Sequence, residues 1–346
     1  MFETSKNVSI VIATYNGAAF IVPQLESILE QSFRPKEIIL SDDASTDNTL
    51  SLVSSIASKS DIPVKIIRNE TPLGFRDNFL HAASHATGDF IAFCDQDDIW
   101  ERDKLERCAA YFDDRHVSLI VHQALSFDSA SGRSWLFSQG IGNTRTRPPL
   151  SYDPWMTFFG FSIVFRRELL LLADFEARFK DFIAPAHKIA HDRWIMFLGQ
   201  MVGETVEIGA PLVRYRQHGA NLFGDGKNKK RNQAGNLVSM SEDYIIATEG
   251  MIAAVESFPE EAKALFPLFD KLKAISFLEA ALRQLKNRKD VYTSTTRLAS
   301  FRQIVGNAAS GTYVGVHNHA IRWRSLAKDV SYLVKRDEPS QADSRH

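Results

Sequence analysis

The first 120 residues of the chain alternate between short β-rich apolar runs and segments whose apolar residues recur at helical spacing. The pattern predicts strands over residues 8–14, 37–41, 64–67, 89–94 and 117–124. It predicts helices between them, over residues 20–31, 50–56, 75–86 and 104–112. Strands that alternate with helices through short connections form right-handed βαβ units, so we expect a largely parallel sheet. Ligands of such sheets bind beyond the carboxyl ends of the strands, which here are residues 14–16, 42–43 and 95–98.

The remainder of the chain has a different pattern. Residues 133–149 are rich in Gly, Ser, Arg and Pro and predict a loop, whereas residues 190–201 predict a helix and residues 206–216 a strand. A polar, basic, turn-rich segment at 224–235 predicts a linker. Beyond it, two apolar stripes predict helices, and the last ten residues predict a frayed tail. The stripes are Leu272, Ile275, Leu278, Leu282 and Leu285, then Leu326, Val330, Leu333 and Val334 with Trp323 at its edge. We therefore expect two regions, residues 1–225 and residues 226–346.

Composition narrows the class of protein. Apolar residues make up 44% of the 346 residues and charged residues 24%, which excludes global disorder. Two cysteines are too few for a disulfide framework, so a cytoplasmic protein is the simpler expectation. Because no run of about 18 apolar residues occurs, we predict no transmembrane helix.

The net charge of −1 conceals an asymmetry between the two regions. Residues 227–346 carry 19 basic and 13 acidic side chains, a balance of +6, and the rest of the chain has a balance of −7. The acidic N-terminal part argues against nucleic-acid binding. The basic part predicts either peripheral contact with an anionic membrane, at the inner face of the plasma membrane, or a solvated basic face.

Three carboxylates, Asp95, Asp97 and Asp98, directly follow the strand predicted at 89–94. Carboxylates placed side by side repel one another, and burial increases the cost of each charge. A divalent cation removes this conflict, and Mg²⁺ and Mn²⁺ favour carboxylate and phosphate oxygens. The alternative is a solvated acidic turn, which the apolar residues on both sides of the motif disfavour.

Two further motifs follow predicted strands. After the second strand, Asp42 and Asp43 come too early to cap the next helix, a role that suits Asp47. A carboxylate there can accept a hydrogen bond from the imide N–H of uracil or thymine. After the first strand, Tyr15 can stack on a base and Gly17 allows close approach of the backbone to a ligand, although this sequence is also that of an ordinary turn.

These three motifs, in the order in which they follow one another along the chain, resemble glycosyltransferase family 2, the inverting enzymes of the GT-A fold. The resemblance covers about residues 8–225, and residues 95–100 are similar to a subgroup of rhamnosyltransferases. It implies a GT-A (Rossmann-like), mostly parallel sheet flanked by helices, with the C-terminal helical region as an appendage. It also implies a nucleotide-facing set of residues, comprising Thr14, Tyr15, Asn16, Asp42, Asp43, Arg76 and Asp95. The alternative interpretation of Arg76 is a surface residue at the start of a helix.

The same resemblance implies residues for the metal and for catalysis. Asp97 would bind Mg²⁺ or Mn²⁺, and His218 would reach the metal or the diphosphate. Asp192 would be the general base that inversion requires, with its neighbour His191 as the local rival. The alternative for Asp192 is a helix cap. The aromatic segment 155–162 predicts either an acceptor pocket or plain core.

The expected activity is metal-dependent, inverting transfer of a sugar, with L-rhamnose as one candidate, from a dTDP- or UDP-sugar. The acceptor would be a hydroxyl of a glycan or lipid-linked glycan in cell-surface polysaccharide synthesis. A non-catalytic nucleotide- or glycan-binding scaffold is the alternative from another class. A sugar-1-phosphate nucleotidyltransferase is disfavoured because residues 13–19 carry no charge, whereas that reaction needs a Gly-rich, basic loop after strand one.

Overall fold

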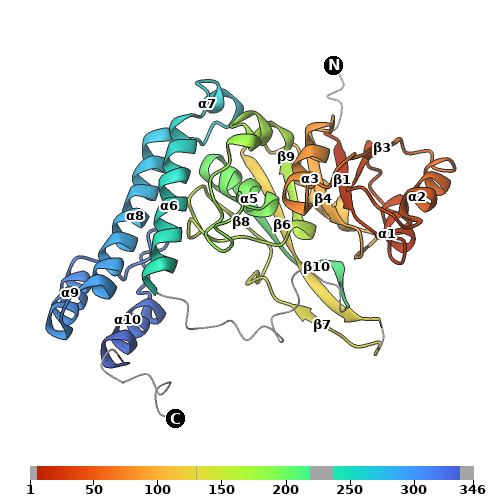
Figure 1. Cartoon of the computed structure of the whole chain (residues 1–346). Coiled ribbons are helices and arrows are strands. Elements are labelled where there is room, and N and C mark those ends of the chain that lie inside the picture. The colour runs from red at the N-terminus through yellow and green to blue at the C-terminus, as the bar shows by residue number, and fades with distance from the viewer. Residues whose placement is uncertain (1–5, 130, 219–236, 336–346) are drawn as a thin grey trace, which may run out of the picture.

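A computed structural model describes residues 6–129, 131–218 and 237–335, and a ten-stranded sheet crosses the described part of the chain (Figure 1). The strand order is β3-β2-β1-β4-β9-β6-β10-β5, with β7 beside β6 and β8 beside β10. The strands are β1 (Val8–Thr14), β2 (Glu37–Asp42), β3 (Val64–Arg68), β4 (Phe90–Asp95), β5 (Ile99–Trp100), β6 (Val117–Asp128), β7 (Ser134–Phe137), β8 (Arg145–Arg147), β9 (Ile163–Arg166) and β10 (Glu204–Gln217).

Helices cover both faces of this sheet and form the C-terminal region. The α-helices are α1 (Ile21–Leu29), α2 (Thr49–Ala57), α3 (Phe75–Ser84), α4 (Lys104–Ala109), α5 (His191–Val202), α6 (Leu237–Glu256), α7 (Ala262–Leu265), α8 (Lys271–Thr293), α9 (Arg297–Ala309) and α10 (Trp323–Lys335). Three short 3₁₀ turns are η1 (Gly160–Ser162), η2 (Arg167–Leu171) and η3 (Phe175–Ala177).

Strand β1 shows how the sheet divides the core into two layers. Its side chains alternate, so Ile10 and Ile12 pack with α1, α2 and α4, while Val11 packs with α3 and α5 on the opposite face. These residues are fully buried. A three-layer α/β arrangement is therefore confirmed, with the sheet between two helical layers.

The register of the parallel strands places the motifs at one edge. Thr14 pairs with Asp42 across β1 and β2, and Ala13 pairs with Asp95 across β1 and β4. Because these strands run in the same direction, their carboxyl ends meet at the same edge of the sheet. The polar residues that follow each strand are thus brought together.

The sheet is mixed rather than uniformly parallel. Strand β9 joins its two parallel halves by pairing antiparallel with β4 and with β6. The loop prediction for residues 133–149 is also wrong in part, since this segment contains β7 and β8. Both strands form by pairing with distant chain, β7 with β6 and β8 with β10, which local composition does not encode.

Helices α6 and α8 share the core of the sheet domain, because Met251 of α6 and Leu278 of α8 belong to the same apolar cluster as Trp194 of α5. Leu272, which belongs to the first predicted apolar stripe, is 78% exposed. The predicted linker at 224–235 and tail at 337–346 lie outside the described residues, as does the expected boundary near residue 225. Within the described ranges, no helix combines the length and the apolar character that crossing a bilayer requires.

Candidate active site

A cavity of about 440 Å³ opens at the edge where β1, β2 and β4 end. Its walls also include the start of α5, the η1 turn and the residue after β10. The predicted site residues that line it are Thr14, Tyr15, Asn16, Asp43, Asp95, Asp97, Asp192 and His218. Segments more than 200 residues apart in sequence thus converge on one space, as expected where parallel strands end at one edge of a sheet.

The turn after β1 is held against the acidic turn after β4. The backbone N–H of Tyr15 donates to Gln96 Oε1 at 2.9 Å, and Gln96 Nε2 donates back to the Tyr15 carbonyl at 3.2 Å. A Cβ atom at Gly17 would lie 2.3 Å from Gln96 Oε1, so a larger residue there would displace the Gln96 side chain. Gln96 lines the cavity and belongs to the predicted acidic motif, although sequence reasoning gave it no role.

Asp42 and Asp43 are adjacent in sequence but differ in environment. Asp42 is fully buried and accepts hydrogen bonds from the Thr14 hydroxyl at 3.0 Å and the Ser45 hydroxyl at 2.6 Å. It is not among the residues that line the cavity. The position of Asp42 therefore does not support the predicted contact with a nucleotide. Its carboxylate instead holds the ends of β1 and β2 together through Thr14 and Ser45.

Asp43 lines the cavity and holds the loop before α3. Its carboxylate accepts from Asn69 Nδ2 at 3.0 Å, Leu73 N at 2.7 Å and Gly74 N at 2.8 Å. A carboxylate has about four lone-pair sites, so one remains for a ligand.

The acidic turn is fixed from β10. The Arg216 Nε donates to the Asp97 carbonyl at 2.8 Å, and the Arg216 backbone N–H donates to Asp98 Oδ1 at 3.0 Å. The Asp98 side chain is fully buried, and burial raises its pKa well above the usual range. Burial, together with the charges of Asp97 and Asp192, raises the pKa of Asp95 to about 7. The carboxylates are thus close enough to oppose one another's ionisation.

His218 Nε2 lies 2.9 Å from Asp97 Oδ2, which places the two predicted metal residues together. Among the described residues, no group of three or more His, Cys, Asp or Glu side chains is arranged to enclose a metal ion. Mg²⁺ commonly uses one or two carboxylates and takes its remaining ligands from substrate phosphates and water. The Asp97–His218 pair, with Asp95 beside it, fits a cation of this kind, shared with a diphosphate.

Asp192 lies in the first turn of α5 and faces the cavity. Its Oδ1 accepts from the Arg193 backbone N–H at 2.7 Å. Burial raises the pKa of the Asp192 carboxyl, whereas the Arg193 charge acts in the opposite direction. A raised pKa moves a carboxylate closer to the range in which a general base is effective.

His191, the local rival, has a different environment. Its ring stacks on Phe79 with the centroids 4.0 Å apart, and a Cβ at Gly160 would lie 2.8 Å from its Nε2. Burial, and the nearby charges of Arg178, Arg76 and Arg193, lower the pKa of His191 to about 3. At neutral pH the imidazole is therefore uncharged and far from the pKa that would make it an effective base.

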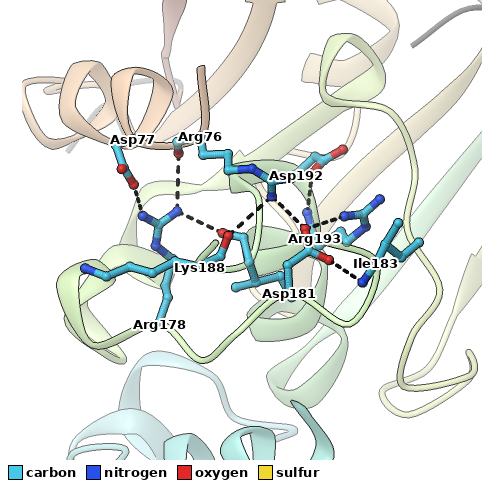
Figure 2. A network of polar contacts seen from close by, with 9 residues as sticks. Arg76, Asp77, Arg178, Asp181, Ile183, Lys188, Asp192 and Arg193 are labelled. Carbon is cyan, nitrogen blue, oxygen red and sulfur yellow. Dashed lines mark hydrogen bonds and ion pairs between the residues drawn. The ribbon is translucent and has the colours of Figure 1, made fainter. Parts of the chain in front are cut away.

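A network of ion pairs connects the start of α5 to α3 and to the segment before α5 (Figure 2). The carboxylate of Asp181 has no exposed surface, and its Oδ2 accepts from Arg76 Nη1 at 2.6 Å and Arg193 Nη1 at 2.7 Å. Its Oδ1 accepts from the Ile183 backbone N–H at 2.9 Å. Figure 2 shows Arg76 and Arg193 reaching Asp181 from different elements, α3 and α5.

The network corrects the expectation for Arg76. Its guanidinium pairs with Asp181 and also donates to the Lys188 carbonyl at 3.3 Å, and Arg76 is not among the cavity-lining residues. Beside it, Arg178 pairs with Asp77 and donates to the Ile189 carbonyl at 2.9 Å. In this structure Arg76 therefore joins α3 to the segment before α5, outside the lining of the cavity. No local pattern in the sequence pointed to Asp181.

Replacing Asp181 with alanine is expected to lower the free energy of unfolding by about 3–5 kcal/mol, because two arginines only 14% exposed lose their shared counter-charge. Denaturant unfolding measures the change. Glu176→Ala is the matched control, since the Glu176–Lys188 pair is exposed and should contribute about 0–1 kcal/mol. Equal losses in the two variants would show that the Asp181 network does not stabilise the fold.

Aromatic side chains form the rest of the cavity wall. From the predicted segment 155–162, Phe159, Gly160 and Phe161 line the cavity. Trp155 instead donates from its Nε1 to the Thr248 hydroxyl at 3.0 Å, so only part of the segment faces the cavity. Several residues that line the cavity were not predicted from the sequence. They lie just before α1, in α3 and in β10, and are Phe20, Phe75, Asn78, Phe79 and Tyr215.

Comparisons with known proteins show what the chain resembles. Residues 9–171 match the model of the family described as "Glycosyl transferase family 2". Asp192 and His218 lie beyond the matched segment.

Two relatives illustrate the similarity. WfgD of Escherichia coli, named a UDP-Glc:alpha-D-GlcNAc-diphosphoundecaprenol beta-1,3-glucosyltransferase, is 38% identical over 120 residues, which are 35% of this chain and 43% of WfgD. RfbG of Shigella flexneri, named a dTDP-rhamnosyl transferase, is 28% identical over 234 residues, which are 63% of this chain and 77% of RfbG. The chain thus spans less than half of the first of these proteins and about three quarters of the second.

A solved structure shares the fold. The crystal structure of Staphylococcus aureus TarS 1–349 in complex with UDP aligns with a TM-score of 0.55 at 18% identity, covering 94% of this chain and 89% of that one. The likeness confirms a GT-A-like α/β architecture with a helical C-terminal region. The family match, the relatives and this fold together support a glycosyltransferase. Over residues 9–171 the chain is similar to glycosyltransferase family 2.

Proposed function

We propose that the cavity binds a nucleoside diphosphate sugar and transfers the sugar, with inversion, to an acceptor hydroxyl. The observation that carries the proposal is the convergence of Asp43, Asp97 and Asp192 on one cavity of about 440 Å³. These three carboxylates come from different elements, and each suits a different part of the reaction.

The nucleotide would occupy the side formed by the ends of β1 and β2. Asp43 retains one lone-pair site, which would accept the imide N–H of uracil or thymine. Tyr15 is exposed at the mouth of the cavity, where its ring would stack on the base. Asn16 and Thr14 would complete this side of the pocket.

The diphosphate would lie beside the acidic turn. Asp97 and His218 would hold a Mg²⁺ or Mn²⁺ ion, with Asp95 close to the ribose. When bound, the cation would supply positive charge to stabilise the departing diphosphate. Arg216 keeps the acidic turn in place through its bonds to the backbone of Asp97 and to Asp98.

The acceptor would enter against the aromatic side of the cavity. Phe159, Phe161 and Tyr215 offer apolar faces on which a sugar ring can pack. Asp192 would take the proton from the attacking hydroxyl as the bond between the anomeric carbon and the diphosphate breaks on the opposite side. Its place in the first turn of a helix favours the ionised carboxylate that this step needs.

The finer identities of donor and acceptor are proposals that draw on the relatives' names. RfbG is named as a dTDP-rhamnosyl transferase and TarS was solved with UDP, so we favour a dTDP- or UDP-sugar, with L-rhamnose as one candidate. WfgD is named for a diphosphoundecaprenol-linked acceptor, which supports a glycan or lipid-linked glycan acceptor for this chain. Such an acceptor would bring the protein to a membrane surface on the cytoplasmic side.

A thermal-shift panel of UDP, dTDP, CDP and GDP, with and without Mn²⁺, tests the nucleotide assignment. UDP or dTDP with Mn²⁺ should raise Tm by about 3–6 °C at a concentration near 100 times Kd. CDP should give a smaller shift because cytosine has no imide N–H to donate to Asp43. A larger shift with GDP, or equal shifts with CDP and UDP, would contradict the role proposed for Asp43.

A further inference from the structure

Helix α9 exposes a row of large apolar side chains. Leu298, Phe301 and Val305 recur at i, i+3 and i+7, which places them on one side of the helix. Each is more than half exposed. A different side of α9 packs through Ile304 against Val291 and Tyr292 of α8. The exposed row therefore takes no part in the packing of α9 against α8.

Helix α10 exposes a similar row beside a basic one. Trp323, Val330 and Val334 lie on one side of the helix and are between 41% and 66% exposed. Val330 and Val334 belong to one predicted apolar stripe with Leu326 and Leu333, and Trp323 lies at its edge. Of these residues, Leu326 and Leu333 pack toward the neighbouring helices. The adjacent side of α10 carries three exposed basic residues, Arg324, Lys328 and Lys335.

The outward direction of the α10 row is fixed by a buried polar network. Asp329 of α10 has no exposed surface and accepts from Arg288 Nη2 at 2.6 Å and from the Tyr313 hydroxyl at 2.9 Å. The Tyr292 hydroxyl also donates to this carboxylate. Because Asp329 must face inward to keep these bonds, α10 cannot rotate its apolar row into the core.

The exposed apolar side chains are concentrated in this part of the molecule. Of the fifteen large apolar residues that are exposed in the described parts of the chain, seven lie between residues 298 and 334. They belong to α9, α10 and the segment between them, which lie at one end of the α6–α8 pair (Figure 1). Apolar surface gathered in this way marks an interaction site rather than a random surface.

We propose that this α9–α10 surface docks on an anionic phospholipid bilayer. The apolar rows would enter the boundary between headgroups and acyl chains, where tryptophan is favoured, and the basic row would meet the lipid phosphates. A helix with an apolar side next to a basic side is the form that lies in the plane of a membrane interface. Docking of this surface does not depend on the transfer reaction.

The charge on α10 argues for lipid over a second copy of the chain. A two-fold dimer through this surface brings the same face of both subunits together, so Arg324 and Lys335 would approach their own copies. Like charges in contact across an interface are unfavourable. An anionic bilayer instead complements the same charges.

Flotation of the full chain with phosphatidylcholine vesicles, with and without phosphatidylglycerol, tests the proposal. The wild type should bind the vesicles that contain phosphatidylglycerol and should bind them less at high salt. The variant Trp323→Ser/Val330→Ser/Val334→Ser should lower the partition coefficient by about tenfold or more, since it removes apolar area that would become buried in the bilayer on binding. The variant Arg324→Glu/Lys335→Glu should lower it by at least about tenfold.

Matched variants elsewhere separate this surface from general effects. Leu272→Ser removes a more exposed apolar side chain from α8, and Lys59→Glu reverses a basic charge beside α2, and both should bind as the wild type does. The proposal is overturned if the α10 variants also bind like the wild type, or if the wild type binds neither kind of vesicle. It is equally overturned if light scattering shows a wild-type dimer that the triple Ser variant dissociates while vesicle binding is absent.

Discussion

Replacement of Asp192 by asparagine is expected to lower kcat by about 10²–10⁴-fold while leaving the Kd for the donor within about twofold. Asparagine keeps the size of aspartate and can still accept the hydrogen bond from the Arg193 N–H. It cannot take a proton from the acceptor hydroxyl. The loss should therefore fall on the chemical step, which single-turnover kinetics and donor titration measure separately.

The pH profile gives this prediction a second readout. Burial raises the pKa of Asp192 above that of an exposed aspartate, and the ionised form is the active one. The wild-type kcat/KM should thus rise with pH through that raised pKa, and the rising limb should disappear in Asp192→Asn. The limb does not belong to His191, whose pKa of about 3 leaves it neutral throughout. Equal loss of donor affinity and turnover would assign Asp192 a structural role instead.

Replacement of Asp97 by asparagine is expected to lower metal-dependent turnover by about 10²–10⁴-fold, because a bound cation contributes several kcal/mol to the stabilisation of the leaving diphosphate. His218→Gln should act in the same direction, since its Nε2 lies 2.9 Å from Asp97 Oδ2. Rates measured against Mn²⁺ concentration should show that both variants need more metal for half-maximal activity.

The control for Asp97 is Asp61→Asn, which removes a carboxylate that pairs with Arg34 on the exposed surface. It should leave the metal dependence unchanged. If Asp97→Asn turns over at the wild-type rate, or if the wild type is fully active in EDTA, the metal assignment is wrong.

Much of this site could be predicted because parallel strands bring their carboxyl ends to one edge. The sequence placed polar motifs after three strands, and the register of Thr14 with Asp42 and of Ala13 with Asp95 is what makes them neighbours. His218 reaches the same edge because β10 ends there and lies against the acidic turn through Arg216. A motif that follows a strand can thus be located from strand direction alone.

Side-chain direction could not be predicted in the same way. Asp42 and Asp43 were assigned together, yet Asp42 turns inward to Thr14 and Ser45, while Asp43 faces the cavity. Arg76 was expected at a diphosphate, but a buried carboxylate 105 residues away captures its guanidinium. The direction of the Arg76 side chain depends on a partner that is distant in sequence. The directions of Asp42 and Asp43 depend on the pleat of β2, which alternates the side on which successive residues lie. A local sequence pattern shows neither of these.

The most direct measurement is the crystal structure of the chain with Mn²⁺ and either UDP or dTDP, with the metal located by anomalous diffraction. We expect one Mn²⁺ bound to Asp97 and to diphosphate oxygens, the imide N–H directed at Asp43, and Asp192 across the cavity from the diphosphate. A nucleotide seated outside this cavity, or bound within it with its base away from Asp43 and its diphosphate away from Asp97, would contradict a single shared site.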